Sequence, residues 1–256
     1  MRVKNVSRDG VPVLSRLVTA LAPYGLNLVG TTAVDAYDAA VPPALGLRRL
    51  LPAARTAIVI GNGGGAFWAA FRDSCRAHPE HEREPDPIDA FTRRVIETVI
   101  AATIDTRVPT RLLYPFRYPD DPVSFMRLAE CAGLGRPSLL GVLVHPVFGP
   151  WIALRAALLV PLTLAAPRPA DGFDPCPGCT ERACVDACPA GAVTAAGWDV
   201  PRCAAHRLQA EDPCASRCHA RFDCVIGRPY RYSPDALEYH QGRALAGIAR
   251  HARTRA

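Results

Sequence analysis

The stretch Cys176-Pro-Gly-Cys-Thr-Glu-Arg-Ala-Cys-Val-Asp-Ala-Cys-Pro189 presents four cysteines in close succession and determines how the C-terminal part of the chain folds. A turn that offers three thiolates from one loop, followed by a Cys-Pro step that directs a fourth sulfur to a second cluster, is typical of iron–sulfur ligation. Eight thiolates suffice for two 4Fe–4S clusters, and one cluster is the alternative. The predicted ligands are Cys176, Cys179, Cys184, Cys188, Cys203, Cys214, Cys218 and Cys224.

Other uses of these cysteines stay open. Four residues separate Cys179 from Cys184 where two are typical, and Val225 stands where proline usually follows the last cysteine. Structural zinc is one alternative, although only one pair has the Cys-x-x-Cys spacing that such sites use twice. Disulfides are another, and they require an oxidising compartment. The remaining two cysteines, Cys75 and Cys131, are expected to be small buried side chains on helices.

Charge and apolar runs suggest where the protein acts. Arg16 interrupts the only apolar stretch near the N-terminus, which argues against an export signal, and no later run is long enough to cross a membrane without a charge. We therefore expect a cytoplasmic protein without a membrane partner. The formal charge is +6, but the arginines are scattered, so no nucleic-acid partner is expected.

At 256 residues and 49% hydrophobic composition, the chain is long enough for one sizeable core and a small additional module. We predict a first domain over residues 1–165, a linker rich in proline and alanine over 166–174, and an iron–sulfur module with a C-terminal helix over 175–256.

Hydrophobic periodicity predicts the main elements. Helices are expected at 14–21, 66–76, 87–104, 125–131 and 233–250, and strands at 26–34 and 56–60. Residues 139–145 and 151–160 are expected to form an antiparallel hairpin at the centre of a sheet. The glycine loop at 61–65 follows a strand and precedes a helix, so Gly63 and Gly64 either contact a cofactor phosphate or form a tight turn.

Four stretches in the first part of the chain resemble the cobalamin C family of cobalamin-processing decyanases and dealkylases. They are Leu21-Ala-Pro-Tyr-Gly25, Tyr37 followed by Val41-Pro-Pro-Ala44, Asp86-Pro-Ile-Asp89 and His145-Pro-Val-Phe-Gly-Pro-Trp-Ile-Ala-Leu-Arg155. The resemblance implies an α+β fold like that of flavin reductases and nitroreductases, which holds cobalamin base-off. It also implies cofactor contacts from His145, Phe148, Trp151 and Arg155. For His145 a structural role at a strand end is the alternative, and for Arg155 a pair with a carboxylate.

A second resemblance overlaps the first. Arg127-Leu-Ala-Glu-Cys-Ala-Gly-Leu-Gly135, followed by ferredoxin-type cysteines, is similar to the epoxyqueuosine reductases and the reductive dehalogenases, which are corrinoid enzymes with two clusters. It implies one cluster on Cys176, Cys179, Cys184 and Cys224, and another on Cys188, Cys203, Cys214 and Cys218. The catalytic aspartate of epoxyqueuosine reductase is replaced by Pro119. Asp120, Asp121 and Glu130 are therefore the candidate acids, although a turn role is the alternative for the two aspartates.

Together these observations predict an iron–sulfur oxidoreductase that reduces cobalamin, with removal of cyanide from cobalt as the leading reaction. A flavodoxin, a ferredoxin or a reductase is the expected electron donor. A corrinoid-dependent reductase of an organic substrate is the first alternative. A ferredoxin-type electron carrier without a corrinoid, whose first domain binds flavin or nothing, is the second.

Overall fold

The computed structural model describes residues 12–118, 120–164, 172–209, 211 and 213–255. These residues divide into two compact units, which are described separately. The first unit takes residues up to 134 together with residues from 153 to 164, and the second takes residues 135–152 together with those from 172 onward. Residues 166–171 of the predicted linker lie outside the described residues.

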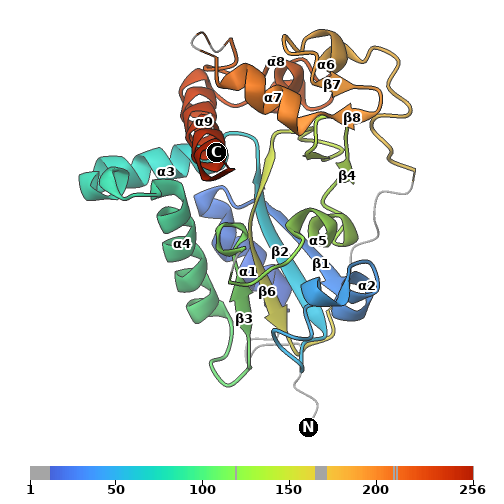
Figure 1. Ribbon diagram of the computed structural model, residues 1–256. Coiled ribbons are helices and arrows are strands. Elements are labelled where there is room, and N and C mark those ends of the chain that lie inside the picture. The colour runs from blue at the N-terminus through green and yellow to red at the C-terminus, as the bar shows by residue number, and fades with distance from the viewer. Residues whose placement is uncertain (1–11, 119, 165–171, 210, 212, 256) are drawn as a thin grey trace. The chain divides into compact units, whose positions relative to one another are not determined.

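A four-stranded sheet forms the centre of the first unit (Figure 1). Its strands, in spatial order, are β1 (Leu28–Ala33), β2 (Thr56–Gly63), β6 (Ile152–Val160) and β3 (Arg111–Leu113). β1 pairs antiparallel with β2, with Leu28 opposite Gly61, and β3 pairs antiparallel with β6, with Arg111 opposite Leu159. All eight residues of β2 are buried, so both faces of the sheet are covered at this strand.

Helices cover this sheet because each presents an apolar side to it. α1 (Val13–Leu21) buries Val13, Leu17 and Leu21 and packs against α4 (Pro87–Thr103). α2 (Val34–Asp38) and α5 (Phe125–Cys131) pack against each other and against β1, while α3 (Ala66–Ala77) packs against β2. The short 3-10 turns of this unit are η1 (Ala22–Tyr24), η2 (Pro43–Leu45), η3 (Pro79–Arg83) and η4 (Pro115–Arg117).

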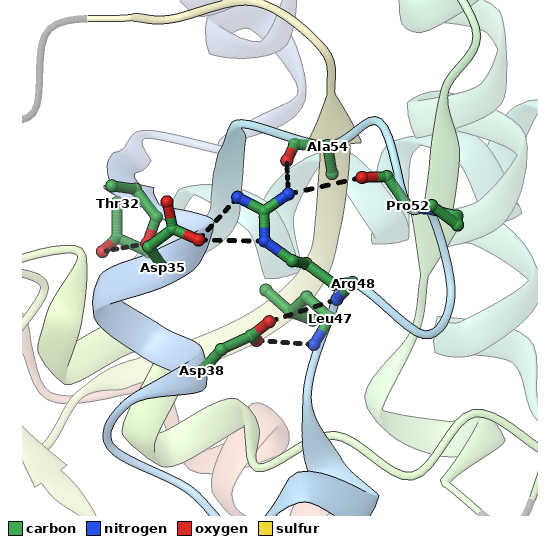
Figure 2. Close-up of polar contacts among 8 residues, drawn as sticks. Thr32, Asp35, Asp38, Leu47, Arg48, Pro52 and Ala54 are labelled. Atoms are coloured by element: carbon green, nitrogen blue, oxygen red, sulfur yellow. Dashed lines mark hydrogen bonds and ion pairs between the residues drawn. The ribbon is translucent and has the colours of Figure 1, made fainter.

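One arginine ties together the connection between α2 and β2. Figure 2 shows the Arg48 guanidinium donating from Nε and Nη2 to the Asp35 carboxylate, at 2.9 and 2.5 Å, and from Nη1 to the carbonyls of Pro52 and Ala54. The carboxylate of Asp38 accepts the backbone N–H groups of Leu47, at 2.7 Å, and Arg48. These side-chain contacts add to the backbone turns of the connection, which include η2.

The second unit consists of two short ladders and several helices. β4 (Arg136–Pro137) pairs with β5 (Leu143–Val144), and β7 (Val193–Thr194) pairs with β8 (Gly197–Trp198). The helical elements are α6 (Ala183–Asp186), α7 (Val200–Arg207), α8 (His219–Phe222), η5 (Arg228–Tyr230) and α9 (Pro234–Arg255). As the sequence predicts, α9 begins with Pro234 at its first position, where the missing N–H costs nothing.

The predicted hairpin between residues 139–145 and 151–160 is wrong. β5 pairs with β4, whereas β6 lies between β2 and β3. The bridge between His145 and Gly149 closes the turn that follows the first segment and does not reach the second. Pro146 and Pro150 have no N–H to donate and stand on either side of this turn, so a ladder cannot continue through it. The other predicted helices and strands are present with boundaries shifted by a few residues. No helix within the described ranges is long and apolar enough to cross a membrane.

Candidate metal centres

Four cysteines of the second unit converge on one cavity. Cys176, Cys179, Cys184 and Cys224 line it together with apolar side chains that include Leu139, Leu140 and Val144. The chain reaches Cys184 through Arg182, whose φ of +42° is the only positive value of a non-glycine residue in the described parts of the chain. This left-handed residue directly precedes α6 and lies within the four-residue spacer between Cys179 and Cys184, which is longer than the usual ferredoxin spacing.

The other four cysteines line a separate cavity of about 360 Å³. They are Cys188, Cys203, Cys214 and Cys218. Cys203 lies in the first turn of α7, whose N-cap Asp199 accepts the backbone N–H of Arg202 at 3.0 Å and so fixes where the helix begins. The two cavities therefore divide the eight cysteines into the same two sets of four that the resemblance to epoxyqueuosine reductases implies.

A small apolar cluster contacts cysteines of both cavities. Leu140 lines both of them and packs in a buried cluster with Val193 and Ala220. Two cysteines from each set pack against this cluster: Cys184 and Cys224 from the first, and Cys188 and Cys218 from the second. Two cysteines of each set thus pack against the same small apolar cluster.

Each cavity has a backbone donor directed at a sulfur. The N–H of Leu139 donates to Cys176 Sγ at 3.4 Å, and the N–H of Ala192 donates to Cys188 Sγ at 3.3 Å. Such donors stabilise thiolates and set the potential of a bound cluster. Burial, together with neighbouring thiols, raises the pKa of Cys184, Cys218 and Cys224, so metal binding must displace protons from these groups.

The distances between the cysteine sulfurs indicate whether a single tetrahedral metal ion fits these sites. Tetrahedral zinc with Zn–S bonds of about 2.3 Å requires sulfurs roughly 3.8 Å apart. Among the described residues, no three of the cysteine sulfurs lie within 4.8 Å of one another. All ten cysteines are free thiols. As the described residues lie, these thiols form no disulfide and no group of three sulfurs close enough for one tetrahedral ion.

His145 has a structural role in the second unit. Its Nδ1 accepts the backbone N–H groups of Val147, at 3.1 Å, and Phe148, at 3.2 Å, so it closes the turn that carries both prolines. Nδ1 is therefore the acceptor, and the proton of the neutral ring lies on Nε2. Burial lowers the pKa of His145, which favours this neutral form. The Nδ1 atom of His145 is thus occupied by the backbone of its own turn.

Trp151 and Phe148 also pack within the second unit. Trp151 is fully buried, and its ring contacts those of Phe222 and Tyr232. The guanidinium of Arg221 lies 4.7 Å from the centre of the Trp151 ring and donates to the carbonyl of Pro150. Phe148 packs edge-on against Tyr230. Residues 145–151 are therefore held onto α8 and the segment after it.

The glycine loop and Arg155 lie in the first unit. The N–H of Gly63 donates to Asn27 Oδ1 at 2.7 Å and its carbonyl accepts from Asn27 Nδ2 at 3.0 Å, so this N–H is not available to a phosphate. Gly64 has a φ of +69°, as a tight turn requires. Arg155 donates from Nε to Asn62 Oδ1 at 2.7 Å, and its guanidinium lies 4.2 Å from the centre of the Phe67 ring.

The three candidate acids each pair with an arginine of the first unit. Asp121 is buried and accepts two hydrogen bonds from Arg111, at 2.8 and 2.9 Å. Asp120 accepts from Arg117, and Glu130 accepts from Arg127 at 2.6 Å. Each candidate acid is therefore held in place by an arginine of its own neighbourhood.

Sequence reasoning did not identify the polar residues that position the cysteines. Asp199, Arg207 and His206 were not singled out, although Asp199 followed closely by Pro201 is a typical start of a helix. His206 Nε2 is buried in the wall of the second cavity without a hydrogen-bond partner among the described residues.

Comparisons with known proteins support the fold. No family model and no curated protein matches the chain. Epoxyqueuosine reductase from Bacillus subtilis is similar in structure, with a TM-score of 0.56 at 14% identity over 88% of this chain and 70% of that chain. CblC, a B12-trafficking protein from C. elegans, gives a TM-score of 0.56 at 16% identity over 90% of each chain. The catabolic reductive dehalogenase NpRdhA gives a TM-score of 0.42, too low to indicate a shared fold.

Proposed function

We propose that this protein is an iron–sulfur oxidoreductase that reduces cobalamin and thereby releases the cyanide bound to its cobalt. The observation that carries the proposal is the pair of four-cysteine cavities that share the wall residue Leu140. The fold supports the corrinoid as substrate, because the similar structures include a B12-trafficking protein and a reductase.

The residues of the second unit would hold two 4Fe–4S clusters, one on each set of four cysteines. When bound, these clusters would supply single electrons at low potential. Leu140, Val193 and Ala220 would give cysteines of both sets an apolar surface to pack against. The backbone N–H groups of Leu139 and Ala192 would donate hydrogen bonds to the ligand sulfurs of Cys176 and Cys188. The substrate would be bound base-off by the first unit, and a flavodoxin, ferredoxin or reductase would return electrons to the second.

Metal analysis tests the cysteine assignment. Full-length protein reconstituted anaerobically should hold about eight irons and eight sulfides per chain, because two cubanes each take four of both. The variants Cys179→Ala and Cys218→Ala should each lose about half of the iron, while Cys131→Ala, which lies in the first unit, should lose none. Stoichiometric zinc without sulfide in the wild-type protein would refute the proposal.

The fold shared with epoxyqueuosine reductase also favours a second function, reduction of an organic substrate by a protein-bound corrinoid. That chemistry requires an acid beside the substrate, so Asp120→Asn, Asp121→Asn or Glu130→Gln would abolish turnover while leaving cobalamin reduction intact. A third function, electron transfer without a corrinoid, predicts that the anaerobic protein leaves every form of cobalamin unbound. Titration with cyanocobalamin therefore separates it from the other two.

A further inference from the structure

Two arginines and two histidines line the wall of the second cavity. Three of these four side chains have a hydrogen-bond partner among the described residues. Arg207 donates to Gln241 Oε1 at 2.7 Å and to its backbone carbonyl at 3.1 Å. Arg221 donates to the carbonyl of Pro150, and His219 Nε2 lies 2.9 Å from the carbonyl of Pro213. His206 Nε2 is buried and has no such partner in the described part of the chain.

The local structure holds His206 toward the same cavity as Cys203. Both lie on α7 three residues apart, and residues at this spacing occupy one face of a helix. The Asp199 cap fixes the first turn of α7, and buried Arg207 ties its last turn to α9. The backbone position of His206 on α7 is therefore fixed from both ends of the helix.

A buried ring nitrogen without a partner costs free energy, because its hydrogen bonds to water are lost on folding. The cavity wall brings the four sulfurs of Cys188, Cys203, Cys214 and Cys218 around the space that His206 also lines. Sulfurs of a cluster accept hydrogen bonds, and each such bond stabilises the more negative, reduced state.

We propose that His206 Nε2–H donates a hydrogen bond to a sulfur of the second centre and raises its reduction potential. His206 is then a positioning residue that sets the order of potentials of the two centres. The inference rests on the proposed function, because it requires the second set of cysteines to hold a cluster.

The test is a redox titration of the full-length, anaerobically reconstituted protein followed by electron paramagnetic resonance. His206→Leu should lower the midpoint potential of one cluster and leave the other unchanged. His206→Gln, whose side-chain amide can still donate a hydrogen bond, should have a midpoint potential close to that of the wild type. His219→Leu is the matched control, because it removes an imidazole from the same wall whose Nε2 already has a partner, and it should leave both potentials unchanged.

The outcomes separate the two proposals. Wild-type protein with only four irons would overturn both the second centre and the role of His206. Wild-type protein with eight irons whose potentials do not move in His206→Leu would overturn the role of His206 alone. Loss of the second cluster in both His206 variants would also overturn it, because His206 would then be a ligand. Labelling the protein with ¹⁵N-histidine should reveal a weak nitrogen coupling to one reduced cluster, present in wild type and absent from His206→Leu.

Discussion

Gly149 is the point of closest approach between the turn at residues 145–149 and the segment that carries Cys224. Its φ is +58°, and a Cβ here would lie 2.0 Å from the carbonyl oxygen of Ile226. Gly149→Ala would cost about 1–2 kcal/mol in left-handed strain alone, and the backbone clash must in addition displace the segment that follows Cys224. We expect this variant to lose iron from the first centre, as measured by metal analysis and thermal unfolding.

Gly65→Ala is the matched control for this substitution. Gly65 has a φ of −86° and no atom within 4 Å of the position of its Cβ. This variant should keep the full iron content and unfold at or slightly above the wild-type temperature. Equal iron content in the two alanine variants would show that the turn does not support the first centre.

At the residue scale, the spacing of the cysteines was enough to propose the eight ligands. Contacts between residues far apart in the sequence could not be predicted from spacing. The side chain of Asn27, 36 positions away in the sequence, hydrogen-bonds both the N–H and the carbonyl of Gly63. The sequence alone could therefore not distinguish this glycine loop from a phosphate-binding loop. Arg111 pairs with Asp121 through a turn that has no sequence signature. His145 was recognisable as structural, because the backbone donors that it accepts lie only two and three residues away.

At the scale of single elements, α7 joins Cys203 and His206 to its N-cap. Asp199→Ala removes the side-chain acceptor of the Arg202 N–H and should cost about 1 kcal/mol. Because the cap lies four residues before Cys203, we also expect the second cluster to assemble more slowly and to be lost faster on exposure to oxygen. Absorbance changes during anaerobic reconstitution and after exposure to air measure both.

Ser124→Ala is the control for the loss of a cap. Ser124 Oγ accepts the backbone N–H of Arg127 at the start of α5, which lies in the first unit. This variant should also lose stability while its clusters assemble and persist as in wild type. If both variants lost cluster stability equally, the effect of Asp199 would be a general one.

At the same scale, hydrophobic periodicity predicted the long helices but not the pairing of the strands. Long helices such as α4 and α9 were predictable because their apolar positions repeat and their caps are marked by proline. The segments at 139–145 and 151–160 are equally apolar, but period-two patterns do not say which strands pair. Pro146 and Pro150 were the available signal against a hairpin, and the apolar pattern outweighed them in the prediction.

At the scale of the whole molecule, an α+β fold with a separate cysteine module follows from the sequence, whereas the path of the chain between the compact units does not. Residues 135–152 group with the cysteines, although they lie within the predicted first domain of residues 1–165. Leu140, Trp151 and the turn closed by His145 contribute to the core of that second unit. Cutting the chain near residue 165 would separate these residues from their partners, so tests of coupling are better made with point variants of the full chain.

The last prediction concerns whether the centres serve the corrinoid. Wild-type protein and the double variant Cys179→Ala/Cys218→Ala should bind cyanocobalamin with the same affinity, because both cysteines lie outside the first unit. Binding should shift the absorbance spectrum to the base-off form. With the same external electron donor, both proteins should convert bound cyanocobalamin to cob(II)alamin, with loss of one cyanide per electron. The wild type should do so at least about tenfold faster than the double variant. Equal rates would refute the role of the centres and leave the binding claim standing, whereas absence of binding in both proteins would refute the corrinoid itself.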